Sequence, residues 1–226
     1  MSQKPSVRRP TVMRIVITSD THGKHDQLVD LSGDVLIHCG DFCDGFRPDV
    51  DDLQRIDDWF GTQDFSRILC VGGNHDFVAQ DNSGDGPLFQ NATYLLDTSV
   101  VIDGVRFYGA PWVPMLECWA YYLPDDDLRS KWSLVPDDTD VLITHTPPWH
   151  TLDSPRNPTV HCGCSHLAAR IADLNLRLHC FGHNHASYGR ADRDGVTYLN
   201  ASAVNSNFDI ANPPFIFDIE PTSSVG

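Results

Sequence analysis

Short apolar runs bounded by glycine, proline or charged residues recur along most of the chain. Continuous runs of Val, Ile and Leu are typical of buried strands, because a strand covered on both faces has no polar side. The pair Asp103-Gly104 stands between two β-rich runs and predicts a hairpin turn. The segments that we expect to form strands are Arg14–Thr18, Val35–His38, Arg67–Val71, Thr93–Leu96, Ser99–Ile102, Val105–Gly109, Asp140–Thr144, Leu178–Phe181, Val196–Leu199 and Phe215–Ile219.

Three further segments are expected to form helices. They carry apolar residues at the spacing of one helix face, or a residue that is typical of a helix start. They are Asp49–Phe60, with Pro48 near its start, Asp125–Trp132, and Ser165–Leu174, with Ser165 as a possible N-cap. Helix and strand signals alternate in the first half, the middle is rich in hairpin signals, and the end is again rich in strands. This order predicts an α/β fold with two sheets and outer helices, rather than one doubly wound sheet.

The length of 226 residues fits a single α/β domain. We expect a tail over residues 1–12, one domain over 13–221 and a short tail over 222–226. The hydrophobic fraction of 41% and the charged fraction of 21% argue against global disorder. No apolar stretch approaches the roughly 20 residues that span a bilayer, and Val12–Thr18 is too short for a signal-peptide core. The expected location is therefore cytoplasmic, with no membrane partner.

Charge and cysteine usage narrow the function further. The formal net charge is -15, which argues against a polynucleotide substrate, because such proteins usually carry a basic stripe. The chain has 7 cysteines, an odd number scattered through apparent strands, which favours reduced thiols in a reducing compartment. Cys162-Gly163-Cys164 has no second pair at zinc-site spacing. A structural loop is the favoured interpretation, with a redox or metal role left open.

Five short motifs follow predicted strands and carry metal-binding side chains. Carboxylates, a carboxamide and imidazoles at successive strand ends predict a site that binds two metal ions, because oxygen and nitrogen ligands suit ions such as Mn²⁺, Fe²⁺ or Zn²⁺. Each motif alone has a plain structural alternative, such as a capped turn, and their combination favours the metal site. The motifs are Asp20-Thr21-His22, Gly40-Asp41-Phe42-Cys43-Asp44, Gly73-Asn74-His75-Asp76, Thr144-His145-Thr146 and Gly182-His183-Asn184-His185.

The local chemistry suggests different roles within these motifs. Asp20 and His22 are two residues apart, so both side chains can reach one ion. The two oxygens of Asp41 can bridge a pair of ions. His75 directly follows Asn74 and points elsewhere, which favours a proton donor or a phosphate-facing cation. Asp44 can orient a histidine or serve as a turn residue.

This ordered set of motifs resembles the calcineurin-like metallophosphoesterase superfamily. Further segments are similar to the metallophosphoesterase-domain-containing (MPPED) family, and they extend the resemblance over nearly the whole chain. The segments that carry this second likeness are Gly109-Ala110-Pro111-Trp112, Trp119-Ala120-Tyr121-Tyr122-Leu123-Pro124, Thr144-His145-Thr146-Pro147-Pro148, Tyr198-Leu199-Asn200-Ala201-Ser202 and Asn212-Pro213-Pro214-Phe215-Ile216-Phe217-Asp218.

The resemblance implies a fold and a set of site residues. The fold would be a four-layer α-β-β-α sandwich of two mixed β-sheets flanked by helices. The cofactor would be two divalent transition-metal ions, with Mn²⁺ favoured over Fe, Zn, Co or Ni. His75 would be the catalytic histidine, partnered by Asp44, and Asn74 would help to stabilise charge. The first ion would be held by Asp20, His22, Asp41 and His185, and the second by Asp41, Asn74, His145 and His183.

These residues lead us to expect a metal-dependent phosphodiesterase for small phosphodiesters, among them 2′,3′- and 3′,5′-cyclic nucleotides. A metal-bridging hydroxide would attack phosphorus, with a nucleoside monophosphate or phosphate as product. The alternative is a nucleotide-binding or scaffold protein with weak catalysis, as in relatives of the MPPED type that lack the first histidine of the last motif. His183 is present here, which argues against that alternative. A nuclease or a phosphomonoesterase is less favoured, and the oligomeric state is left open.

Overall fold

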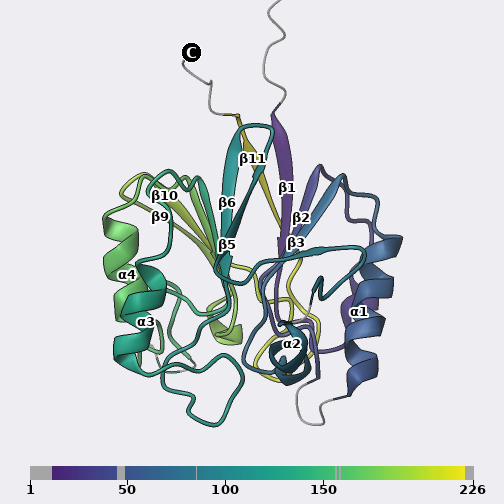
Figure 1. The fold of residues 1–226 in the computed structure, drawn as a ribbon, viewed down its shortest axis with the longest axis horizontal. Coiled ribbons are helices and arrows are strands. Elements are labelled where there is room, and N and C mark those ends of the chain that lie inside the picture. The colour runs from purple at the N-terminus through teal and green to yellow at the C-terminus, as the bar shows by residue number, and fades with distance from the viewer. Residues whose placement is uncertain (1–11, 45–48, 85, 156, 158, 222–226) are drawn as a thin grey trace, which may run out of the picture.

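The structure of the protein is a computed structural model, which describes residues 12–44, 49–84, 86–155, 157 and 159–221. The described strands form two sheets that face each other, as Figure 1 shows. The first sheet has the order β11 (Phe215–Ile219), β1 (Met13–Thr18), β2 (Val35–His38), β3 (Arg67–Cys70) and β4 (Thr93–Tyr94). The second has the order β5 (Thr98–Ile102), β6 (Val105–Ala110), β7 (Val141–Thr144), β8 (Leu178–Phe181), β10 (Val196–Asn200) and β9 (Gly189–Arg193).

Both sheets are mixed, because parallel inner strands carry antiparallel partners at their edges. In the first sheet β1, β2, β3 and β4 run parallel and β11 is antiparallel to β1. In the second sheet β6, β7, β8 and β10 run parallel, and the β5–β6 and β9–β10 pairs are antiparallel. The helices are α1 (Val50–Thr62), α2 (Phe77–Asn82), α3 (Asp125–Trp132) and α4 (Ser165–Ala172), with short 3₁₀ turns η1 (His25–Gln27) and η2 (His185–Ser187).

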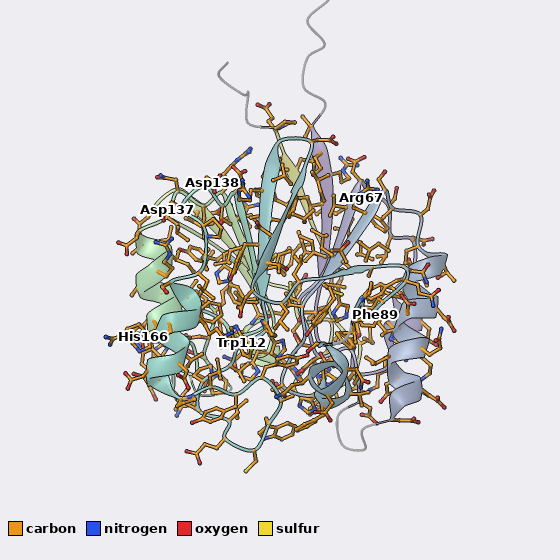
Figure 2. The ribbon with its side chains drawn as sticks, viewed as in Figure 1. Arg67, Phe89, Trp112, Asp137, Asp138 and His166 are labelled. Carbon is orange, nitrogen blue, oxygen red and sulfur yellow. The ribbon has the colours of Figure 1, made fainter. Side chains whose placement is uncertain are left out.

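The alternation of side chains along the strands separates three apolar layers. Ile15 and Ile17 lie in the core between the two sheets, whereas Val16 between them packs in the layer shared with α1. In β7, Ile143 faces the other sheet and Leu142 packs in the layer shared with α3 and α4. The expected four-layer α-β-β-α sandwich is therefore confirmed. Figure 2 shows two side chains of the outer layers, Phe89 on the α1 side and Trp112 on the α3 side.

The parallel strands bring the predicted motifs to one end of the sandwich. β1, β2, β3 and β6 run toward the lower end of the molecule in Figure 1, where α2 lies. β7 and β8 are parallel to β6 and so run in the same direction. Each of the five motifs directly follows one of these strands. The carboxyl ends of parallel strands meet at one edge of a sheet, so the face-to-face packing of the two sheets brings all five motifs together.

The structure also differs from the expectations in a few elements. Strand β9 and helix α2 were not predicted, although Asp194-Gly195, with φ of 51° and 82°, repeats the turn signal of Asp103-Gly104. The latter pair does form the expected hairpin between β5 and β6. Ser165 is not the N-cap of α4: Cys164 occupies that position, and no side chain caps the helix. Pro48 and the two predicted tails, apart from residue 12, lie outside the described residues.

Candidate metal centre

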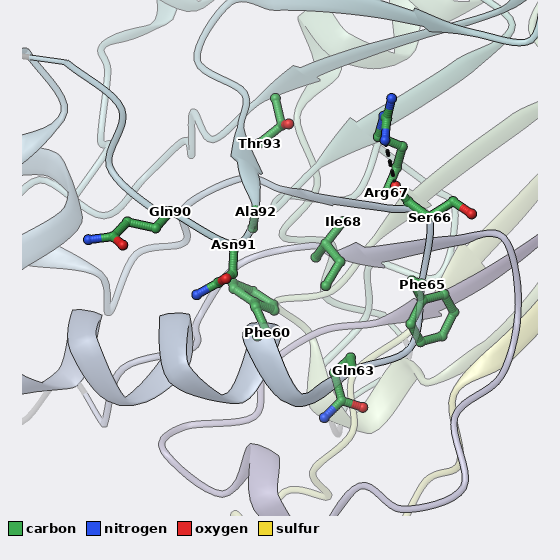
Figure 3. A pocket seen from close by; sticks show the side chains of 11 residues that line it. Phe60, Gln63, Phe65, Ser66, Arg67, Ile68, Gln90, Asn91, Ala92 and Thr93 are labelled. Carbon is green, nitrogen blue, oxygen red and sulfur yellow. Dashed lines mark hydrogen bonds between the residues drawn. The ribbon is translucent and has the colours of Figure 1, made fainter.

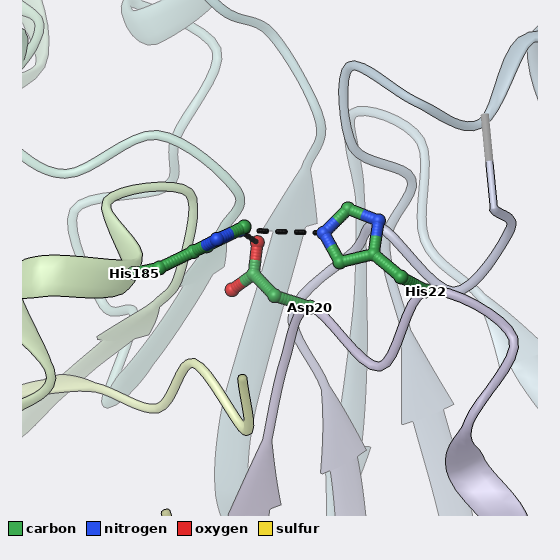
Figure 4. Close-up of side chains that lie close together, drawn as sticks. All are labelled: Asp20, His22 and His185. Atoms are coloured by element: carbon green, nitrogen blue, oxygen red, sulfur yellow. Dashed lines mark hydrogen bonds and ion pairs between the residues drawn. The ribbon is translucent and has the colours of Figure 1, made fainter. Parts of the chain in front are cut away.

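The side chains of the five motifs converge in the structure. One ligand atom from each of Asp20, His22 and His185 lies within 4.8 Å of the other two, and the same holds for two further groups. Figure 4 shows how Asp20 and His22, which follow β1, face His185 at the start of η2. The two further groups are His22 with Asp41 and His75, and Asp20 with Asp41 and His145.

The first donor group consists of Asp20, His22 and His185. The Nε2 atoms of His22 and His185 are 3.3 Å apart, and Oδ1 of Asp20 is 3.5 Å from Nε2 of His185. Oδ2 of Asp41 is 3.9 Å from Nε2 of His22. The side chains predicted to bind the first ion therefore point their donor atoms at a common region.

The second donor group consists of Asn74, His145 and His183. Oδ1 of Asn74 is 3.0 Å from Nε2 of His145 and 2.8 Å from Nδ1 of His183. Oδ2 of Asp41 is 3.3 Å from Nε2 of His145. The same Asp41 oxygen thus approaches a histidine of each donor group, which places it between them.

The hydrogen bonds behind His145 test whether these groups fit a cation. Nδ1 of His145 is 2.8 Å from the carbonyl oxygen of Cys39, which can only accept, so the neutral ring carries its hydrogen on Nδ1. The lone pair on Nε2 then faces the oxygens of Asn74 and Asp41. Three acceptors that face one another repel unless a proton or a cation lies between them, so the residues present fit a metal ion.

The pKa values of the buried ligands agree with this conclusion. Burial lowers the pKa of His145, but the charge of Asp41 and its hydrogen bond outweigh burial and raise the pKa to about 9. The negative charge of Asp41 therefore favours a proton on His145. A divalent cation bound at the same place would balance that negative charge instead. His22 behaves in the opposite way: burial lowers its pKa to about 4, so its ring is neutral and available as a ligand.

The backbone around the centre is strained where ligands are placed. Asp20, His22, Asp41 and His183 have φ angles of 53°, 44°, 54° and 70°, in the left-handed region that non-glycine residues seldom adopt. Each such conformation costs of order 1–3 kcal/mol and is typical of functional sites. Gly182 allows the closest approach: a Cβ at this position would lie 2.1 Å from Oδ2 of Asp20.

Asp76 is a structural residue of the centre for which the motifs alone indicated no role. Its carboxylate accepts hydrogen bonds from the backbone N–H groups of Asp41 (2.8 Å), Cys43 (2.9 Å) and Gly73 (2.7 Å). Burial and then the charge of Asp41 raise the pKa of Asp76 to about 8, although the backbone hydrogen bonds act in the other direction. Asp76 thereby joins the loops after β2 and β3. Its place directly after His75 in the motif was the available signal.

The predicted catalytic pair is placed only in part. His75 is buried, its Nε2 lies 4.0 Å from Oδ2 of Asp41, and its backbone N–H donates to Oδ1 of Asp41 at 2.7 Å. Asp44 is exposed and directly precedes residues 45–48, which lie outside the described residues. The orienting role of Asp44 therefore stays a prediction, as does the catalytic role of His75.

Two tryptophans near the centre have different surroundings. The ring of Trp119 lies 4.6 Å from that of His75, so it borders the site. Trp112 instead donates from Nε1 to Asp97 at 2.6 Å and has the ammonium of Lys131, a residue of α3, over its ring. Trp112 therefore packs against the α3 side of the second sheet. Of the two, Trp119 is the one available to contact a substrate.

One of the hollows in the protein surface lies beside the centre. A cavity of about 440 Å³ beside the centre is lined by Pro155, Asn157, His183, Asn184, His185, Ala186 and Ser206. The loop after His145 contributes to it, and the carbonyl oxygen of Asp153 accepts from Nδ2 of Asn184 at 2.6 Å. A separate pocket of about 340 Å³, between the end of α1 and the start of β3, contains none of the motif residues (Figure 3).

Comparisons with known proteins agree with the geometry. The family model for calcineurin-like phosphoesterases matches residues 13–187. Metallophosphoesterase domain-containing protein 1 of Homo sapiens is 33% identical over 236 residues, which cover 93% of this chain and 72% of that protein. A UPF0046 protein of Caenorhabditis elegans is 32% identical over 222 residues, which cover 92% of this chain and 75% of that protein.

Solved structures share the fold at low sequence identity. Phosphopantetheinyl hydrolase from Mycobacterium tuberculosis aligns with a TM-score of 0.59 and 17% identity, over 96% of this chain and 98% of that one. TT1561 of Thermus thermophilus aligns with a TM-score of 0.57 and 16% identity, over 84% and 89% of the two chains. In the described part of the chain, no helix has the length and apolar character needed to cross a membrane. The family match and the identity over most of the chain show that this protein belongs to the calcineurin-like phosphoesterases, in the branch of the metallophosphoesterase-domain-containing proteins, and is a metal-dependent phosphoesterase.

Proposed function

We propose that this phosphoesterase is a two-metal phosphodiesterase that hydrolyses small phosphodiesters, including 2′,3′- and 3′,5′-cyclic nucleotides. The observation that carries the proposal is the position of Asp41. Its Oδ2 is 3.9 Å from His22 in the first donor group and 3.3 Å from His145, a histidine of the second. A carboxylate between two donor groups supports a pair of ions that share one ligand.

The residues fit two ions with oxygen and nitrogen ligands, for which Mn²⁺ is our favoured choice. When bound, the two ions would supply a water molecule of lowered pKa and positive charge against the phosphoryl oxygens. The proposed ligands are Asp20, His22, Asp41 and His185 for the first ion, and Asp41, Asn74, His145 and His183 for the second.

His75 is proposed to protonate the leaving oxygen. Nε2 of His75 lies 4.0 Å from Oδ2 of Asp41. The neighbouring Asn74 instead directs its amide oxygen at His145 in the second donor group. The hydrogen bond from the His75 backbone to Asp41 holds this segment in place. Proton transfer by a positioned histidine typically contributes about 10²–10⁴-fold to the rate. Asp44, three residues after Asp41, is the proposed partner that orients the ring.

The size and charge of the site support a small substrate. The cavity of about 440 Å³ beside His183 and His185 lies in the usual range for small-molecule sites. The net charge of -15 opposes a polynucleotide, which would need many basic contacts. Trp119 offers an aromatic face next to His75 against which a base or an aryl group could stack.

The test is steady-state hydrolysis by metal-stripped protein reloaded with Mn²⁺. We expect faster turnover of bis-p-nitrophenyl phosphate than of p-nitrophenyl phosphate, and activity on cyclic nucleotides. His75→Ala should lower turnover of the diester about 10²–10⁴-fold with the metal content unchanged, because the proton donor is lost. His166→Ala is the matched control, because that histidine pairs with Asp125 on the outer helices.

Three results would contradict the proposal or one of its parts. Faster turnover of the monoester would refute the diesterase preference, and full activity of His75→Ala would remove His75 from the mechanism. If two bound ions gave no turnover of either substrate, while a nucleoside monophosphate bound tightly, the weakly catalytic nucleotide-binding protein would replace the phosphodiesterase.

A further inference from the structure

Phe208 covers the first donor group from the loop between β10 and β11. Its ring centroid lies 4.9 Å from that of His22 and 4.9 Å from that of His185, in edge contacts with interplanar angles of 69° and 90°. The rings of His22 and His185 are themselves 5.2 Å apart. The three rings therefore form one packed cluster, and edge-to-face contacts of this kind hold aromatic rings in fixed orientations.

The backbone places Phe208 over the histidines at a cost. Its φ of 63° is in the left-handed region, which is unfavourable for a bulky side chain. The loop is held by hydrogen bonds from the N–H of Phe208 to the carbonyl oxygen of Asn205 (2.9 Å) and from the N–H of Asp209 to Oδ1 of Asn205 (3.1 Å). Nζ of Lys24 donates to the carbonyl oxygen of Phe208, which joins this loop to the segment that carries His22. Strain that the surroundings maintain in this way points to a function.

His22 differs from His145 in what orients its ring. A metal-binding histidine almost always donates from its second nitrogen to a carbonyl or carboxylate, as Nδ1 of His145 does to Cys39 at 2.8 Å. Nδ1 of His22 is buried and has no hydrogen-bond partner among the residues that the structure describes. The orientation of this ligand must therefore come from packing, and its ring neighbours are His75, His185 and Phe208.

We propose that Phe208 is a positioning residue for the first metal site: by packing against the rings of His22 and His185, it fixes the orientation of both ligands where, among the described residues, Nδ1 of His22 has no hydrogen bond to do so. This inference rests on the two-metal site proposed above. It predicts an asymmetry, because the two proposed ligands that the Phe208 ring contacts, His22 and His185, both belong to the first ion. The Phe208 ring also lies 6.4 Å from that of His75, which is not a proposed ligand. Loss of the ring should weaken binding of the first ion. Binding of the second ion should be unchanged, because its ligand His145 is fixed by its own hydrogen bond.

The experiment measures Mn²⁺ per chain and the rate of Mn²⁺ release to a chelator, in full-length wild-type protein and in variants. Phe208→Ala should lower the affinity for one of the two ions and speed its release by about tenfold or more, which is the usual effect of losing a group that orients a ligand. Phe208→Tyr keeps the ring and should restore slow release, whereas Phe208→Leu keeps the bulk without the ring and should not. Trp112→Ala is the matched control, because that ring packs against Tyr121 and Lys131, away from the two histidines of the first donor group.

The outcomes separate this inference from the proposed function. Two ions in the wild type, with one released quickly from Phe208→Ala and slowly from Phe208→Tyr, would support the role of Phe208. Equal release from the wild type and Phe208→Ala would overturn that role and leave the two-metal site standing. Loss of both ions from Phe208→Ala would also overturn it, because the effect would then be a general disruption. A wild-type protein that binds fewer than two ions would overturn both proposals.

Discussion

Gly182→Ala gives a sharp test of how closely the two sheets must approach at the metal centre. A Cβ at position 182 would lie 2.1 Å from Oδ2 of Asp20, 2.1 Å from Oγ of Ser19 and 2.7 Å from Cβ of Ser19. Contacts between such atoms are normally no closer than about 3.5 Å, so the neighbours must move by more than about 1 Å. Ser19 and Asp20 are fully buried at the end of β1, which leaves them little room to move.

The expected cost follows from this geometry. Overpacking of a well-packed region by one methyl group destabilises proteins by about 1–3 kcal/mol, occasionally more. We expect the free energy of unfolding of Gly182→Ala to fall by about 3 kcal/mol, at the upper end of that range. Displacement of Asp20 by about 1 Å should also lower the affinity for the first ion. Diester turnover should fall by about 10²-fold, because a misplacement of this size in the reacting geometry has an effect of that order.

The assay combines urea unfolding of the metal-stripped protein with Mn²⁺ binding and diester turnover. Gly189→Ala is the matched control, since among the described residues its Cβ would meet Leu152 at 3.7 Å and the Ser187 carbonyl oxygen at 3.8 Å, both ordinary contacts. That variant should keep wild-type metal binding and activity. If Gly182→Ala also matched the wild type in all three measurements, the tight approach of Gly182 to Asp20 would not be a requirement of the site.

Two further predictions concern buried groups around the centre. Asp76→Asn should lower the free energy of unfolding by about 1–3 kcal/mol in urea titrations. Three backbone N–H groups now donate to the two carboxylate oxygens of Asp76, and an asparagine would offer them only one acceptor oxygen. An unchanged midpoint of unfolding would refute this role. Burial lowers the pKa of His179 to about 3 from its ordinary 6.5, so the folded state resists protonation and stability should fall as the pH drops from about 6.5 toward 3. This histidine should contribute up to about 1.4 kcal/mol per pH unit within that window. His179→Gln should flatten the dependence in urea titrations from pH 7 to 4, and an equally steep decline in that variant would assign the effect to other groups.

The local pattern of the chain was enough to predict most of the sheet structure. Runs such as Val35–His38 and Leu178–Phe181 were located to the residue, because short, mostly apolar runs bounded by polar residues or glycine favour a buried strand. The motifs were equally clear, since carboxylates and histidines directly after buried strands have little structural reason to cluster there. The sequence therefore predicted which side chains meet, and the structure brings all seven proposed ligands together.

The elements that the pattern missed depend on contacts between distant segments. Strand β9 is mostly polar and exposed at a sheet edge, so its pairing with β10 leaves little apolar signal. Helix α2 has only six residues, too few for a recognisable apolar face. Cys164 rather than Ser165 became the N-cap because the surrounding loop, which pairs Cys164 with Pro148, determines where the backbone turns.

The sequence by itself determined the strands, the ligand types and their order, because these depend on side-chain chemistry and on spacing along the chain. Only the tertiary structure decided how the ligands are held. The left-handed backbone at Asp20 and Asp41, the support of two loops by Asp76 and the ring of Phe208 over His22 all arise between segments far apart in sequence. Such contacts have no periodic signature, because they depend on the packing of one sheet against the other.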